Sequence, residues 1–151
     1  MDTVKKLVVV KALVFNANGE VLLVQRSETA PRRPLQWDLP GGFMDDDDES
    51  YQHACLREIQ EETGLSLAGA HLELAFAESK HGDFHGAVTD VSWLYFTGVA
   101  SSTNVELSYE HTAFVWADLA RAQQMITYDT QLRALAYVAE VRPEHRHHYR
   151  T

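Results

Sequence analysis

The sequence has little cysteine, little proline and no long apolar run. Its single cysteine, Cys55, excludes an internal disulfide and suits a reducing compartment, so we expect a cytoplasmic protein. No segment approaches the roughly 20 consecutive apolar residues of a membrane-spanning helix, so no membrane span is expected. The first residues lead into a short apolar stretch that Lys11 interrupts, which indicates a first strand rather than a secretory signal.

Positive charge is also scarce. Lysine and arginine contribute 13 residues against 22 aspartates and glutamates, and the formal net charge is -9. Such an acidic chain repels the backbone of duplex nucleic acid, so we exclude that class of partner. A small polyphosphate is still compatible with this charge if metal cations lie between the carboxylates and the phosphates. The length of 151 residues predicts one domain over 1–151.

Apolar periodicity and turn residues predict a layered α/β architecture. A short turn at 16–19 joins the first two predicted strands, and a loop at 27–36 carries two prolines and two arginines. Paired glycines then indicate a tight turn at 37–42, and a second turn is expected at 82–86. The predicted strands are 7–15, 21–25, 72–78, 88–99 and 112–116, and the predicted helices are 49–63, 118–125 and 129–141.

The helix predicted at 49–63 carries a cluster of acids. At about 100° per residue, Glu58, Glu61 and Glu62 fall on one face. Like charges so close repel one another, and a divalent cation with oxygen ligands, such as Mg²⁺ or Mn²⁺, would compensate them. The three residues alone also suit a solvated helix face, because glutamate is a good helix former.

The surrounding residues decide between these interpretations. From Gly42 to Leu65 the chain resembles the Nudix box, whose glycine, loop acid, arginine, glutamates and terminal glycine appear here in order. Six residues separate Gly42 from Glu49, one more than the family pattern has. Counting from Gly42 assigns the position of the loop acid to Asp48, whereas counting from Arg57 assigns it to Glu49, which we prefer.

The resemblance implies a fold, a metal and a set of roles. It implies an α/β/α sandwich with a central mixed sheet and Mg²⁺ or Mn²⁺ as the cofactor. Glu58 is expected to be a ligand or the catalytic base, and Arg57 and Glu49 are expected to form an ion pair that supports the catalytic loop. A late-loop acid is often added in this family, for which Glu110 is the candidate and Glu106 the alternative. The expected metal ligands are Gly41 through its carbonyl, Glu58, Glu61, Glu62 and Glu110.

The resemblance also implies a nucleotide substrate. Arg26, Arg32 and Arg33 are candidates for binding its outer phosphates, although exposed arginines are common without such a role. Trp37 is the candidate for stacking on the base, whereas Trp93 and Tyr95 are expected in the core. Lys80 to Asp83 lack the proline or tyrosine markers of ADP-ribose and dinucleoside polyphosphate subclasses.

We therefore expect a Nudix pyrophosphohydrolase that converts a nucleoside triphosphate, canonical or modified, to a monophosphate and pyrophosphate. Nucleotide sugars and other dinucleotide pyrophosphates are alternative substrates. A Nudix-fold module that binds nucleotides without turnover is an alternative function. A homodimer is the expected assembly if the chain associates.

Overall fold

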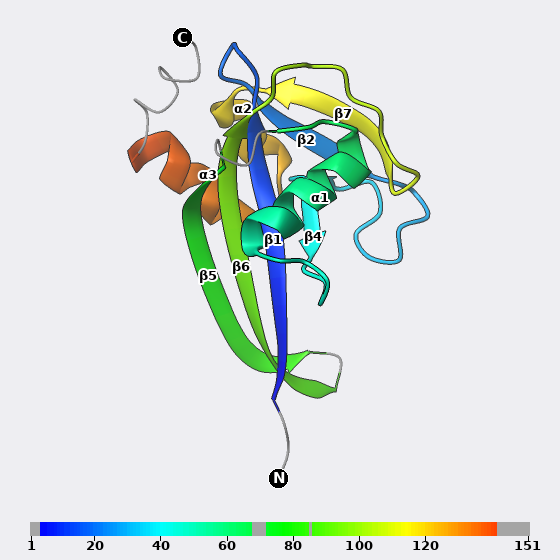
Figure 1. Cartoon of the computed structure of the whole chain (residues 1–151), viewed down its shortest axis with the longest axis vertical. Helices are drawn as coiled ribbons and strands as arrows, with labels where there is room; N and C mark the ends of the chain where they lie inside the picture. Colours follow the sequence, from blue (N-terminus) through cyan, green and yellow to red (C-terminus); the bar gives the residue numbers. More distant parts are fainter. Residues whose placement is uncertain (1–3, 68–71, 85, 142–151) are drawn as a thin grey trace.

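The computed structural model describes residues 4–67, 72–84 and 86–141 (Figure 1). Each predicted strand and helix is present, with two short strands added around the glycine turn. β5 continues to Phe84 and pairs with Ala87, so the turn predicted from residue 82 begins later. The elements are β1 Lys5–Phe15, β2 Val21–Arg26, β3 Trp37–Asp38, β4 Gly41–Phe43, α1 Tyr51–Thr63, β5 Glu73–Phe84, β6 Ala87–Val99, β7 His111–Ala117, α2 Leu119–Met125 and α3 Asp129–Val141.

The strands form one mixed sheet in the order β3-β2-β1-β6-β5, with β4 paired to β1 and β7 paired to β2. β1 and β6 run parallel from the pair Lys5 and Thr89 to the pair Phe15 and Val99. β5 pairs with β6 in the antiparallel direction and forms one edge of the sheet. The predicted central mixed sheet is confirmed.

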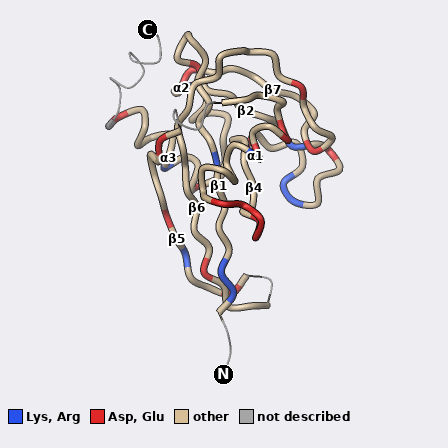
Figure 2. The backbone as a smooth tube through the Cα atoms, in the orientation of Figure 1, with Lys and Arg blue, Asp and Glu red and all other residues tan. Residues whose placement is uncertain are grey.

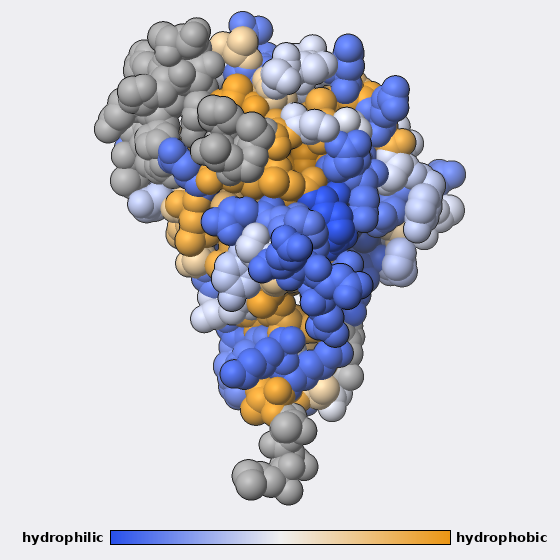
Figure 3. Space-filling view, in the orientation of Figure 1, coloured by the Kyte–Doolittle hydropathy of each residue, from blue (hydrophilic) through white to orange (hydrophobic). Residues whose placement is uncertain are grey.

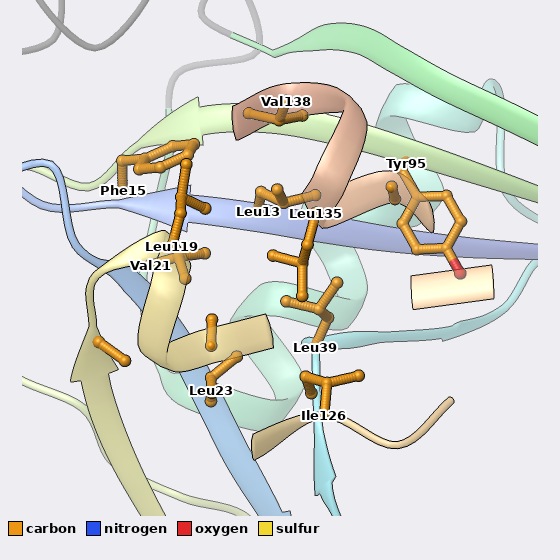
Figure 4. Packing of buried hydrophobic residues seen from close by; sticks show 13 residues of the cluster. Leu13, Phe15, Val21, Leu23, Leu39, Tyr95, Leu119, Ile126, Leu135 and Val138 are labelled. Carbon is orange, nitrogen blue, oxygen red and sulfur yellow. The ribbon is translucent and has the colours of Figure 1, made fainter. Parts of the chain in front are cut away.

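Two apolar cores lie on opposite faces of this sheet. Val10, Ala12 and Val14 of β1 belong to the core beneath α1. The alternate residues Leu13 and Phe15 belong to the core beneath α2 and α3, which Figure 4 shows from close by. Because side chains of a strand alternate between faces, β1 is apolar on both sides. Helices therefore cover both faces, and the predicted α/β/α sandwich is confirmed.

Local signals fix the two ends of α1. The Ser50 hydroxyl accepts a hydrogen bond from the His53 N–H at 3.0 Å, which caps the first turn. Gly64 adopts a φ of 73° and donates its N–H to the Gln60 carbonyl at 2.9 Å, which ends the helix. These boundaries fix which residues of α1 face the glycine turn.

Within the described ranges, no helix is long and apolar enough to cross a membrane.

Candidate active site

The glycine turn lies in direct contact with β1 and with α1. A Cβ atom at Gly41 would lie 2.0 Å from the Val10 carbonyl oxygen, and the φ of Gly41 is 144°. A Cβ at Gly42 would lie 2.8 Å from both carboxylate oxygens of Glu58. Only glycine fits both positions without displacing backbone or carboxylate. The turn therefore brings backbone N–H and C=O groups against the acidic helix.

Two of the three helix acids face this turn. Glu62 Oε2 accepts a hydrogen bond from the Gly41 N–H at 2.7 Å, and the Glu62 residue is 6% exposed. Glu58 lies against Gly42, and its side chain is 14% exposed. Glu61 projects outward, with a side chain 59% exposed. The face that helical spacing predicts the three acids to share thus holds one buried acid, Glu62, one partly buried acid, Glu58, and one exposed acid, Glu61.

The carboxylates of Glu62 and Glu58 are shielded from solvent, and the positive charge around them does not compensate this loss. Burial raises the pKa of Glu62 to about 8. The negative charges of Glu58 and Asp38 raise this pKa further, whereas Lys11 and the hydrogen bond from the Gly41 N–H lower it. Burial also raises the pKa of Glu58, against the effect of Arg57. A divalent cation bound by oxygen ligands would supply the missing charge. The chemistry of these donors therefore fits such an ion.

The loop acid that pairs with Arg57 is Asp48, so the preferred assignment to Glu49 is wrong. Arg57 Nε and Nη2 each donate to Asp48 at 2.9 Å, and the Asp48 side chain is 2% exposed. The Arg57 guanidinium holds the pKa of Asp48 well below its usual range. Glu49 is exposed, and only its backbone N–H contacts His53. With Asp48 as the loop acid, the one residue by which this loop exceeds the family pattern lies between Asp48 and Arg57. The contact between the buried Asp48 carboxylate and Arg57 decides this alignment.

Arg57 also lies between two of the helix acids. Its Nη1 is 3.2 Å from Glu58 Oε1 and 3.1 Å from Glu61 Oε2. Arg57 therefore compensates part of the repulsion between the glutamates, a role that the sequence analysis gave to a metal ion. In the part of the chain that the structure describes, no group of three or more His, Cys, Asp or Glu side chains is arranged as a metal site.

A buried polar network behind the turn was missed by sequence reasoning. Lys11 Nζ donates to Asp38 Oδ1 and to the Leu39 carbonyl, both at 3.0 Å, and lies 3.4 Å from the Gly41 carbonyl. From α3, Gln131 donates to Asp38 Oδ1 at 2.7 Å and accepts from the Leu39 N–H at 3.1 Å. Lys11, a lysine inside an apolar strand, could have indicated this network in the sequence, because a buried charge requires an opposite charge or hydrogen-bond acceptors nearby. The network ties β1, the glycine turn and α3 together.

The proposed phosphate-binding arginines lie at the end of β2 and in the loop that follows it. Arg26 Nη1 is 3.6 Å from Asp38 Oδ2, and its Nε donates to the Arg32 carbonyl at 2.9 Å. Arg33 lies 4.3 Å from the centre of the Tyr128 ring, beside the start of α3. Arg33 also has a φ of 46°, an uncommon conformation for a residue with a side chain. Arg26 and Arg33 therefore lie near the start of α3.

The aromatic residues are mainly structural. Trp37 is partly buried against the core beneath α2 and α3, and it forms a bridge with Ile126. Trp93 packs against the same core. Tyr95 is fully buried, and its hydroxyl lies 2.7 Å from Thr130 Oγ1. Tyr95 therefore belongs to the core, as expected, and Trp93 is partly buried at its edge.

The late loop runs along the C-terminal end of α1. The Glu106 N–H donates to the Thr63 carbonyl at 2.9 Å, and the Ser108 N–H donates to the Glu62 carbonyl at 3.2 Å. Glu110 lies further along, where its carbonyl accepts from the Ser27 N–H at 3.0 Å. Both glutamates are exposed. The backbone contacts bring Glu106 closer than Glu110 to the end of the acidic helix, and the choice between the two side chains stays a prediction.

Comparisons with known proteins agree with this arrangement. The family model of the NUDIX domain matches residues 5–137. Nudix hydrolase 8 of Arabidopsis thaliana is 30% identical over 143 residues, covering 91% of this chain and 37% of that protein. The CTP pyrophosphohydrolase of Escherichia coli K12 is 27% identical over 119 residues, covering 79% of this chain and 82% of that protein.

Solved structures show the same fold. The crystal structure of a MutT protein from Methanosarcina mazei Go1 aligns with a TM-score of 0.74 and 28% sequence identity. The alignment covers 94% of this chain and 99% of that one. Among the curated relatives, the chain spans 37%, 50% and 34% of the length of the first three that it matches.

Proposed function

The chain belongs to the NUDIX domain family, and from this premise we propose that it hydrolyses a nucleoside diphosphate linkage with the help of Mg²⁺ or Mn²⁺. The observation that carries the proposal is the convergence of Glu58 and Glu62 on the glycine turn, where Glu62 is buried and short of positive charge. NUDIX hydrolases generally use divalent metals. The proposed ligands are Glu58, Glu61, Glu62, the Gly41 carbonyl and one late-loop acid, Glu110 or Glu106.

The bound ion would neutralise phosphate oxygens and lower the pKa of a water molecule. Glu58 is the proposed acceptor of the proton of that water, because its carboxylate lies against the glycine turn, where the Gly41 N–H also binds Glu62. Arg57 and Asp48 hold the loop and orient Glu58, so we propose that they act as positioning residues. Glu61 would turn from Arg57 toward the ion when it binds, since its side chain is exposed.

We propose a nucleoside triphosphate as the substrate, with a monophosphate and pyrophosphate as products. The name of the Escherichia coli relative, CTP pyrophosphohydrolase, supports this class. Arg26, Arg32 and Arg33 are the proposed contacts for the outer phosphates, and the exposed part of Trp37 is the proposed contact for the base. A homodimer and a cytoplasmic location stay predictions.

One observation favours a second candidate, a nucleotide-binding module without turnover. Arg57 already pairs with Glu58 and Glu61, and no three-acid metal group is formed among the described residues. Retention of all three helix acids favours the enzyme, because a binding module needs none of them for proton transfer. The two candidates differ in a measurable way, since both bind nucleotide but only the enzyme releases pyrophosphate.

A substrate panel with product masses tests the proposal. The panel contains nucleoside triphosphates, sugar nucleotides, ADP-ribose and dinucleoside polyphosphates, each with Mg²⁺, Mn²⁺ or a chelator. The enzyme should convert triphosphates to monophosphate and pyrophosphate only with a metal. The variants Glu61→Gln and Glu62→Gln should lose this turnover and keep the circular dichroism spectrum of the wild type. Nucleotide binding without turnover of any panel member would favour the binding module instead.

A further inference from the structure

Lys11 is a cation inside the protein. The chain holds four lysines, and the other three are exposed, whereas the Lys11 side chain is 12% exposed. Its neighbours in β1, Val10 and Ala12, are fully buried. Burial alone would lower the pKa of Lys11, but the charges of Asp38 and Glu62 outweigh this effect and raise the pKa above its ordinary value. Lys11 therefore carries its positive charge in the interior at neutral pH.

The contacts of the ammonium are concentrated on the glycine turn. Asp38 Oδ1 and the Leu39 carbonyl each accept a hydrogen bond from Lys11 Nζ at 3.0 Å, and the Gly41 carbonyl lies 3.4 Å from the same atom. An ammonium has three N–H groups and no lone pair, so these three acceptors match its donors. Lys11 therefore acts on the turn and on its charged neighbours, and it cannot be a metal ligand.

Gly41 joins this cation to the buried acid of α1. Its carbonyl lies beside Lys11 Nζ, while its N–H donates to Glu62 Oε2 at 2.7 Å. A Cβ at Gly41 would lie 2.9 Å from the Cδ of Lys11, so the lysine side chain runs directly along the turn. The charge of Lys11 lowers the pKa of Glu62 against the larger effect of burial. Lys11 thus compensates part of the charge of Glu62.

Arg57 compensates the other two helix acids. Its Nη1 is 3.2 Å from Glu58 Oε1 and 3.1 Å from Glu61 Oε2. The surroundings are strongly acidic, since Figure 2 shows the acids at 45–49 as one stretch beside α1. In Figure 3, hydrophilic side chains gather over α1 and the loop before it. Each helix acid thus has a cation of the protein itself nearby.

We propose that Lys11 is an internal counter-charge that lowers the affinity of the acidic site for its divalent ion. This inference rests on the proposed function, because it takes Glu62 and the Gly41 carbonyl as ligands of such an ion. The ion and the Lys11 ammonium carry charge of the same sign, and charges inside a protein are screened much less than charges in water. Lys11 therefore stabilises the acids when no ion is bound and opposes the ion when it binds.

Titration of the full chain with Mn²⁺, followed by electron paramagnetic resonance of the free ion, tests the proposal. Lys11→Met keeps most of the length of the side chain and removes its charge, so Mn²⁺ should bind at least about tenfold more tightly. Asp38→Asn removes a negative charge and keeps Lys11, so Mn²⁺ should bind at least about threefold more weakly. A residue that only shapes the turn would behave differently, because its loss would weaken binding as well.

Two further variants control for net charge and for folding. Lys80→Met makes the same chemical change at an exposed position and should alter Mn²⁺ affinity by less than about twofold, because solvent screens that charge. The double variant Lys11→Met and Asp38→Asn leaves neither charge buried alone, so it extends the test if Lys11→Met does not fold. This double variant should bind Mn²⁺ at least about tenfold more tightly than Asp38→Asn does. Circular dichroism identifies the folded variants.

The outcomes separate this inference from the proposed function. Unchanged or weaker Mn²⁺ binding on adding Lys11→Met to a folded protein, while Glu62→Gln still loses the ion, would overturn the counter-charge and leave the metal site in place. Equal tightening by Lys80→Met would also overturn it, because the effect would then belong to the net charge. No Mn²⁺ binding by the wild type or by any variant would overturn both proposals together.

Discussion

Removing the charge of Asp38 should destabilise the fold measurably. The Lys11 and Asp38 side chains are 12% and 5% exposed, and their atoms Nζ and Oδ1 are 3.0 Å apart. Asp38→Asn keeps the shape and one acceptor oxygen but removes the negative charge beside the Lys11 ammonium, which is left with an amide oxygen and the backbone carbonyls of the turn. Breaking a buried ion pair costs about 3–5 kcal/mol, and these carbonyls favour the low end, near 3 kcal/mol. For a domain of this size, the melting temperature should fall by about 6–12 °C.

Differential scanning calorimetry measures this loss, and Glu78→Gln provides the control. Glu78 pairs with Arg133 at 2.7 Å, but the side chains are 26% and 52% exposed, so this pair should contribute less than about 1 kcal/mol. The double variant Lys11→Met and Asp38→Asn should be more stable than the sum of the single losses predicts, by about 1–2 kcal/mol. Equal melting temperatures for Asp38→Asn and Glu78→Gln would refute the argument that the network is a buried, interdependent unit.

Three further predictions follow from single contacts. Asp48→Ala should lower activity or metal affinity by about 10- to 100-fold, whereas Glu49→Ala should change either by less than about twofold. Equal losses of activity for the two variants in a turnover assay would contradict the assignment of Asp48 as the loop acid. Gly42→Ala should reduce kcat at least about tenfold with an unchanged circular dichroism spectrum, because its methyl group would displace the Glu58 carboxylate from 2.8 Å. Burial lowers the pKa of His111 from 6.5 to about 4, so the folded protein should lose stability as pH falls from 6.5 to 4, where only the unfolded chain takes up the proton. His111→Leu should reduce this slope in melts between pH 7.5 and 4.5, and an identical slope would contradict it.

Local patterns predicted most of the secondary structure. The ends of α1 depend on Ser50 and Gly64, whose capping roles act within a few residues of the chain. The strands followed from apolar runs, whereas helices on both faces of the sheet were implied by the family resemblance. The family resemblance supplied the sheet type. The parallel pairing of β1 with β6 depends on long-range packing that no local pattern encodes.

The same limit applies to the site. Asp48 and Glu49 are adjacent acids, and spacing alone allowed both registers; burial of Asp48 against Arg57 decides between them. Asp38 and Gln131 are 93 positions apart, so their hydrogen bond could not be read from the sequence. Residue types were predictable, but their partners were not.

Glu58 and Glu62, which face the glycine turn, are proposed to hold a divalent ion with which the protein hydrolyses a nucleotide. Phosphorus NMR of CTP incubated with Mg²⁺ and either the wild-type protein or Glu62→Gln tests this claim most directly. We expect resonances of CMP and pyrophosphate for the wild type, their loss on adding EDTA, and unchanged CTP for the variant, which should keep a native melting transition. Equal rates of CTP breakdown by the wild type and Glu62→Gln, or a wild-type rate that EDTA leaves unchanged, would contradict it.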